Sequence, residues 1–195
     1  GDMTIVEDDI FGDFEPEPPP RLAALDGLSR VIRIGSYSKT LSASARCGYI
    51  AARPDWIEGL VDLQIATNFG GPNPVSSEII AHMLSGGGYR KHMEELRRRL
   101  VRARREAADR LHRLGIDPWL LPRGGFNLWC RLPEGLDSGA LAQAAVAGGV
   151  VLAPGNVFSP SASATGFMRF NVAHMLEPRV YTALAAAMRS AFDAP

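Results

Sequence analysis

The chain has 195 residues and a mass of 21.0 kDa, and its 46% hydrophobic and 22% charged residues are sufficient for a sizeable buried core. Lysine plus arginine and aspartate plus glutamate both total 21, and this balance argues against a strongly basic surface for nucleic acid or membranes. The longest apolar stretches, such as residues 183–188, are far short of the roughly 20 residues that span a bilayer. With no signal-peptide pattern, we expect a cytoplasmic location.

The N-terminal half begins with residues typical of strands. A β-rich run at residues 4–7 ends in Asp8 and Asp9, and further strands are predicted at residues 31–36 and 47–51. A proline-rich loop separates the first two. We expect these strands to belong to a mixed or parallel sheet, with the two carboxylates at a strand end.

Helices are predicted next, at residues 54–66 and 74–84, before a glycine-rich break at residues 86–88. Apolar residues then recur at spacings of three and four from Tyr89 to Leu114, which predicts a helix of about seven turns ending at Gly115. The opposite face carries acidic residues and many arginines, Arg104 among them, and is predicted to be solvated and salt-bridged.

The remaining sequence predicts a compact α+β domain with its helices on one side of a small sheet. Its elements are expected at residues 126–132 (strand), 138–147 (helix), 150–153 (strand), 167–172 (strand) and 177–192 (helix). The two cysteines, Cys47 and Cys130, are predicted to be buried thiols. The four histidines lack metal-ligand spacing, so no metal site is predicted, and His174 is expected to be solvated.

Lys39 is one of only two lysines in the chain. Unlike a guanidinium, a lysine amine can lose its proton and attack a carbonyl to form an imine. The position of Lys39 in the sequence favours, by itself, an ordinary surface lysine, but the neighbouring residues change that interpretation. Ser36 and Arg46 suit a phosphate, whereas the carboxylate of Asp8 suits a protonated ring nitrogen.

The run Gly35-Ser36-Tyr37-Ser38-Lys39-Thr40-Leu41, followed by Arg46-Cys47-Gly48-Tyr49, resembles the lysine motif of class I/II aminotransferases, which are fold-type I pyridoxal-phosphate (PLP) proteins. The resemblance implies that Lys39 forms the Schiff base with PLP and shuttles a proton. It also implies that Ser36 and Arg46 bind the phosphate and that Asp8 pairs with the pyridinium nitrogen, with Asp9 a weaker claimant.

Two further positions matter to the resemblance. Arg169 resembles the arginine that binds the substrate α-carboxylate; within an apolar strand it would be costly to bury unless paired. Phe11 departs from the pattern, because the family usually has a tyrosine there that contacts the cofactor. The departure puts efficient transamination in doubt.

The implied fold class is α/β. Residues 1–85 would be a remnant of the PLP-binding large domain, with a mixed, mostly parallel sheet, and residues 86–195 an α+β small C-terminal domain. The family begins with a further stretch that supplies a phosphate loop and a ring-stacking aromatic residue. We therefore expect this chain to be a fragment that by itself binds PLP poorly.

Two functions fit the parent protein. The favoured one is the effector domain of a GntR/MocR-type transcription regulator, and the alternative is an aminotransferase acting between an amino acid and a 2-oxo acid. A degenerate fold without PLP is a third possibility, less favoured because Lys39, Arg46, Asp8 and Arg169 are all present. The expected ligand is an amino acid or related amino compound, and the expected assembly is a homodimer. DNA would be bound only through a separate N-terminal helix-turn-helix domain.

Overall fold

The computed structural model describes residues 3–17, 19–68 and 70–192. The chain divides into two compact units, Gly1–Arg97 and Arg98–Pro195. The division falls inside helix α4 (Gly88–His112), later in the chain than the boundary expected after residue 85. Within the described residues, no helix has both the length and the apolar character needed to cross a membrane.

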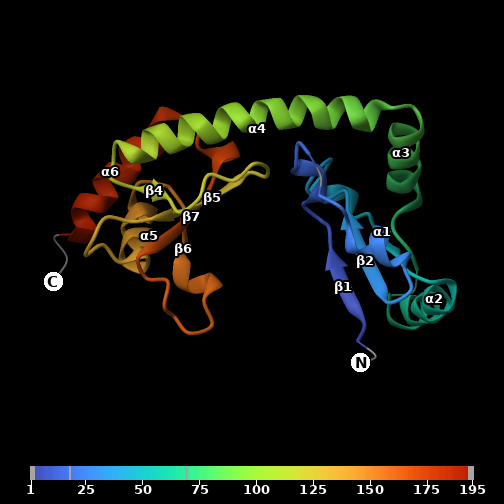
Figure 1. Ribbon diagram of the computed structural model, residues 1–195. Coiled ribbons are helices and arrows are strands. Elements are labelled where there is room, and N and C mark those ends of the chain that lie inside the picture. Colours follow the sequence, from blue (N-terminus) through green and yellow to red (C-terminus); the bar gives the residue numbers. More distant parts are fainter. Residues whose placement is uncertain (1–2, 18, 69, 193–195) are drawn as a thin grey trace. The chain divides into compact units, whose positions relative to one another are not determined.

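The first unit contains a mixed three-stranded sheet in the order β1-β2-β3 (Figure 1). Its strands are β1 (Ile5–Asp8), β2 (Val31–Ser36) and β3 (Gly48–Ala51). Strand β2 pairs in parallel with β1 and antiparallel with β3. The mixed sheet confirms the expected fold class, although its pairs are one parallel and one antiparallel.

Short elements connect β1 to β2, and the sequence did not predict them. They are the 3-10 helix η1 (Gly12–Phe14) and helix α1 (Leu22–Asp26). The Glu7 carboxylate accepts hydrogen bonds from the backbone N–H groups of Leu22 and Ala23, at 2.7 and 3.1 Å, which satisfies free donors at the start of α1. A side chain distant in sequence thus stabilises this short helix.

Helices α2 (Pro54–Asn68) and α3 (Pro74–Ser85) begin where the sequence predicts them and end within two residues of the predicted ends. Asn73 caps α3 by accepting from the N–H groups of Val75 and Ser76. The glycine-rich break is also confirmed, since Gly87 adopts a left-handed conformation with φ of 73° between α3 and α4.

Helix α4 buries the apolar stripe that its sequence predicts, including Met93, Leu100, Ala103, Ala107 and Leu111. One expectation for the opposite face was wrong. Arg104 is only 5% exposed, and its guanidinium donates to the carbonyl oxygens of Gly125 (2.5 Å) and Arg123 (2.8 Å). Five donors on a planar group let arginine satisfy two loop carbonyls from one buried position.

The second unit is built on an antiparallel four-stranded sheet in the order β4-β5-β7-β6. Its strands are β4 (Asp117–Pro118), β5 (Asn127–Arg131), β6 (Ala153–Pro154) and β7 (Phe167–Asn171). Strand β4 was not predicted, and β6 is shorter than expected. Residues 155–158 and 172–174 form the 3-10 helices η3 and η4.

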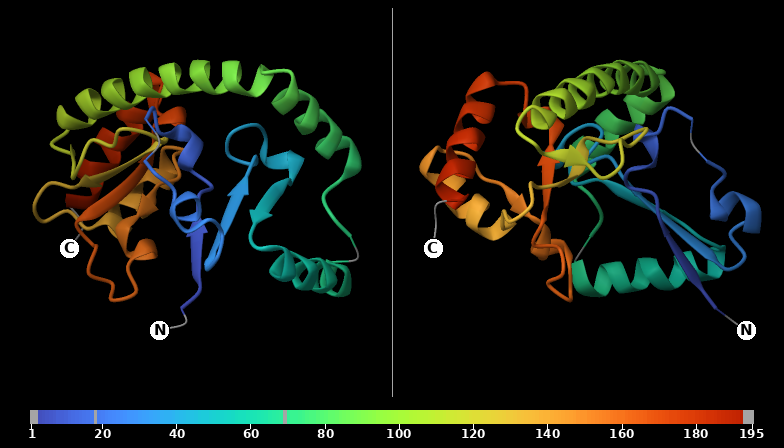
Figure 2. Two further views of the ribbon diagram at one scale, coloured as in Figure 1. Left: turned by 45° about the vertical axis from the view of Figure 1, so that its right-hand side comes forward. Right: turned by 60° about the vertical axis from the view of Figure 1, so that its left-hand side comes forward.

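Helices α5 (Ser138–Ala147) and α6 (Pro178–Phe192) pack against each other on one side of these strands (Figure 2). The cross-strand pairs Leu128–Phe170 and Cys130–Met168 form the buried face of the sheet. This confirms the predicted α+β arrangement. Both cysteines are free and buried, as expected.

Candidate functional site

One edge of the β1-β2-β3 sheet collects the predicted cofactor-binding residues of the first unit. Asp8 is the last residue of β1 and Ser36 the last of β2, and these parallel strands end at the same edge. Because β2 and β3 are antiparallel, the chain leaves this edge after Ser36 and returns to it at Gly48. Lys39 and Arg46 lie in the intervening connection. The fold therefore brings Asp8, Ser36, Lys39 and Arg46 to one end of one sheet.

The connection that carries Lys39, residues 37–47, is a defined turn. The Tyr37 N–H donates to the Cys47 carbonyl (3.0 Å), and the Leu41 N–H donates to the Tyr37 carbonyl (2.9 Å). The Ser36 hydroxyl oxygen accepts from the Ser38 N–H at 3.1 Å and lies 3.4 Å from the Cys47 carbonyl oxygen. These bonds fix the turn on both sides of Lys39. The lysine is thus presented on a held loop.

The Lys39 and Arg46 side chains are exposed and available. Among the described residues, neither the Lys39 amine nor the Arg46 guanidinium has a hydrogen bond or ion pair. Arg46 also has left-handed backbone angles, φ 45° and ψ 38°, at the end of the short helix η2 (Ala43–Ala45). Such a conformation costs a non-glycine residue roughly 1–3 kcal/mol and is concentrated at ligand sites. Both cations are therefore exposed and unpaired among the described residues.

The two neighbouring aspartates have different environments. Asp9 is 8% exposed and forms ion pairs with Arg21 and Arg33, the first at 2.9 Å. Burial lowers the pKa of Arg33, but the bond to Asp9 and nearby negative groups raise it overall. Asp8 is exposed, and its Oδ1 accepts only a local bond from the Ile10 N–H (3.0 Å). Asp9 is therefore occupied within the fold, whereas Asp8 can receive a ligand.

Aromatic side chains surround the base of the Lys39 turn. The Tyr37 ring packs against Tyr49 from β3, with centroids 5.8 Å apart, and edge-on against Tyr89 from α4, at 5.7 Å. Burial and a hydrogen bond to Asp13 raise the pKa of Tyr89. The sequence placed Tyr89 at the start of the apolar stripe of the predicted helix and predicted no contact between the Lys39 turn and either Tyr89 or His92. Their spacing of three places them on one helix face.

Arg169 lies in the second unit, on the sheet face opposite the core. It pairs across the strands with Trp129, and its guanidinium lies over the Phe158 ring at 4.3 Å from the centroid. The side chain is exposed. The cost of burying the Arg169 guanidinium is therefore absent. Side chains alternate between the two faces of the sheet along β7, and Met168 and Phe170 are the ones that are buried.

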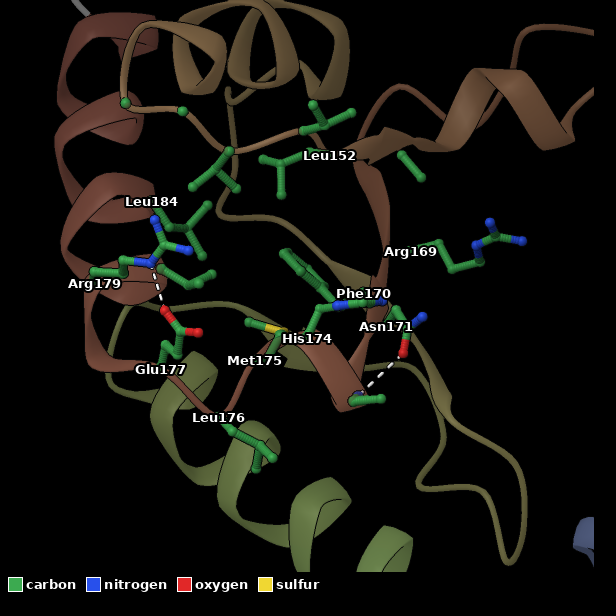
Figure 3. Close-up of a pocket in the computed structure, with 17 residues that line it drawn as sticks. Leu152, Arg169, Phe170, Asn171, His174, Met175, Leu176, Glu177, Arg179 and Leu184 are labelled. Atoms are coloured by element: carbon green, nitrogen blue, oxygen red, sulfur yellow. Dashed lines mark hydrogen bonds and ion pairs between the residues drawn. The ribbon is translucent and has the colours of Figure 1, made fainter. Parts of the chain in front are cut away.

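A pocket of about 540 Å³ lies beside this strand, between the 148–153 segment, η4 and the start of α6 (Figure 3). Leu152, Val180 and Leu184 supply apolar walls, while Arg169 and His174 also line it. His174 is exposed, as expected. In the parts of the chain that the structure describes, no cluster of three or more His, Cys, Asp and Glu side chains could hold a metal.

Comparisons with known proteins give a consistent result. The family model for aminotransferase class I and II matches residues 2–186. An uncharacterized helix-turn-helix (HTH)-type transcriptional regulator, YisV of Bacillus subtilis, is 36% identical over 138 residues, covering 69% of this chain and 28% of the relative. Aromatic-amino-acid aminotransferase 1 of Thermococcus litoralis is 33% identical over 189 residues, covering 92% of this chain and 44% of the relative.

Solved structures agree with the sequence relatives. Kynurenine aminotransferase of Pyrococcus horikoshii, in complex with PMP, superposes with a TM-score of 0.82 at 27% identity, over 97% of this chain and 48% of that one. The chain thus spans less than half the length of these relatives, and the matched part includes both units described above.

Proposed function

Because the chain belongs to the aminotransferase class I and II family, we propose that it forms part of a PLP-binding effector domain in an HTH-type transcription regulator of the GntR/MocR kind. PLP would be bound at the sheet edge of the first unit. The ligand sensed through it would be an amino acid or a related amino compound. DNA would be contacted by another part of the protein.

The observation that carries this proposal is the gathering of four suitable groups at one sheet edge. The Lys39 amine can bond covalently to an aldehyde, and the Ser36 hydroxyl and Arg46 guanidinium can bind a phosphate. The Asp8 carboxylate can hold a proton on a ring nitrogen, whereas Asp9 is already paired with two arginines. Bound PLP supplies an electron sink for chemistry at an amino compound's α-carbon. The residues present fit the cofactor.

Arg169 would bind the carboxylate of the amino compound. Its fork of donors matches a carboxylate, and its stacking on Phe158 restricts the guanidinium plane while leaving the donor edges exposed. Among the described residues it has no ion pair. An amine without a carboxylate should therefore bind more weakly than the corresponding amino acid.

Phe11 favours sensing over turnover. The side chain of a phenylalanine at this position cannot donate a hydrogen bond, and the residue is 49% exposed. An aminotransferase remains the second candidate, supported by the 33% identity to an aminotransferase over 92% of the chain. Both candidates imply a homodimer in the full-length protein.

The test is the absorbance spectrum of the full-length protein with PLP, beside a Lys39→Ala variant. We expect a visible band from the lysine-linked cofactor that the variant lacks, and reduction with borohydride should fix the cofactor mass on Lys39. A wild-type protein without the band would refute PLP binding at this site.

Adding amino acids then separates the two candidates. A regulator should show a spectral shift without release of a 2-oxo acid and should change its affinity for promoter DNA. Steady release of a 2-oxo acid would favour the aminotransferase instead. Arg169→Met should weaken the response to amino acids and leave the cofactor band unchanged.

A further inference from the structure

The turn that carries Lys39 is held by a helix distant in sequence. The Nε2 atom of His92, in the second turn of α4, lies 2.7 Å from the carbonyl oxygen of Thr40. Thr40 is 2% exposed and directly follows Lys39. A carbonyl can only accept, so Nε2 carries the proton and donates it, whether the ring is neutral or charged.

A second contact of α4 reaches the other side of the lysine. The Tyr89 ring meets the Tyr37 ring edge-on, and its hydroxyl donates to the Asp13 carboxylate. Arg97 Nε also donates to the Asp13 carbonyl at 2.8 Å. Tyr37 lies two residues before Lys39 and Thr40 one after it, so one helix face contacts the turn on both sides of the amine.

We propose that His92 is a positioning residue for Lys39. Its hydrogen bond fixes the peptide plane between Thr40 and Leu41, and Leu41 closes the turn through its N–H to the Tyr37 carbonyl. Rotation of this peptide plane would change the turn that directs the Lys39 amine. His92 itself does not touch the cofactor; it sets where the amine is held. This inference rests on the proposed cofactor role of Lys39.

Two amide substitutions form a matched test. In His92→Gln the side-chain N–H₂ lies near the former Nε2 and can still donate to the Thr40 carbonyl. In His92→Asn the amide ends near the former Nδ1 and cannot reach it. The His92 ring is exposed, so both polar replacements should leave the fold intact.

The readouts are made on the full-length protein with PLP. We expect His92→Asn to slow capture of PLP by Lys39 roughly three- to tenfold, the effect of losing one hydrogen bond. The midpoint pH of the lysine-linked band should shift as well, whereas His92→Gln should match the wild type in both. Equal behaviour of the two variants, whether unchanged or shifted, would overturn the proposal.

A cofactor-free measurement separates this inference from the proposed function. Amide hydrogen exchange of a peptide covering residues 37–42, without PLP, should be faster in His92→Asn than in His92→Gln or the wild type. If the wild-type protein with PLP shows no band from the lysine-linked cofactor but this exchange difference is present, the cofactor role of Lys39 is refuted and the positioning role of His92 is not. Identical exchange in all three proteins would refute the positioning role.

Discussion

Replacing Arg104 by methionine tests whether a buried arginine holds the 123–125 loop to helix α4. Methionine keeps much of the unbranched stem and has a similar helix propensity, so the change removes mainly the guanidinium. Two carbonyl oxygens, those of Arg123 and Gly125, then lose a charged donor. At roughly 1.5–3 kcal/mol for each such bond, and allowing for partial relaxation, we expect a loss of about 3 kcal/mol.

Amide hydrogen exchange of peptides covering residues 98–132 measures this locally. Since every 1.4 kcal/mol is a factor of ten, exchange should accelerate by about 100-fold. Arg105→Met is the matched control, because Arg105 is the next residue on the same helix and is exposed. Its effect should be within about 0.5 kcal/mol. Equal protection in the two variants would show that the buried guanidinium does not stabilise the loop.

Three further predictions concern the ion pairs of the first unit and the core of the second unit. Asp9→Ala should lower the free energy of unfolding by about 3 kcal/mol, because it leaves Arg21 and Arg33 without their shared carboxylate. The control Asp8→Ala should change the free energy of unfolding little, and equal urea midpoints for the two variants would contradict this prediction. Burial raises the pKa of Cys130 to about 12, because the thiolate is disfavoured away from water. Alkylation of Cys130 in the native protein, followed by mass spectrometry, should therefore stay slow up to pH 9 and become fast only on unfolding. Gly155→Ala should destabilise the second unit by about 1–3 kcal/mol, because a Cβ atom there would lie 2.2 Å from the backbone carbonyl oxygen of Ala164. An unchanged melting temperature would refute that packing.

Periodicity predicted the larger elements well. The stripe on α4 and the alternation along β5 and β7 each reflect one buried face, which sequence spacing encodes directly. Helix α5 was predicted at its observed bounds, and Asp137 explains why, because its carboxylate caps the helix by accepting from the N–H groups of Gly139 and Ala140. Local signals of this kind are sufficient when neighbours in sequence make the contacts.

The predictions failed where the stabilising contact is distant in sequence. Helix α1 depends on Glu7, fifteen residues before Leu22, and the burial of Arg104 depends on a loop about twenty residues later. The short β4 exists because Asp117 and Pro118 pair with the end of β5. None of these contacts leaves a periodic pattern.

The candidate site stays a prediction, made residue by residue from the motif around Lys39, and the fold places Asp8, Ser36, Lys39 and Arg46 at one end of one sheet. The resemblance favoured Asp8 over Asp9 as the partner of the ring nitrogen, whereas composition alone could not separate two aspartates at one strand end. The structure adds a physical difference between the two, because Arg21 and Arg33 form ion pairs with Asp9 while Asp8 is exposed. The supporting contact of His92 was missed because a single histidine on a polar helix gives no sign of its partner.

Helix α4 runs without interruption from Gly88 to His112 and contributes to both units. Each added residue turns an α-helix by about 100°, so one extra residue between Tyr89 and Arg97 would rotate these two side chains apart, although both donate hydrogen bonds to Asp13. Residues on the exposed face of this helix can therefore be replaced at little cost, whereas one residue inserted between Tyr89 and Arg97 would break one of the two contacts with Asp13.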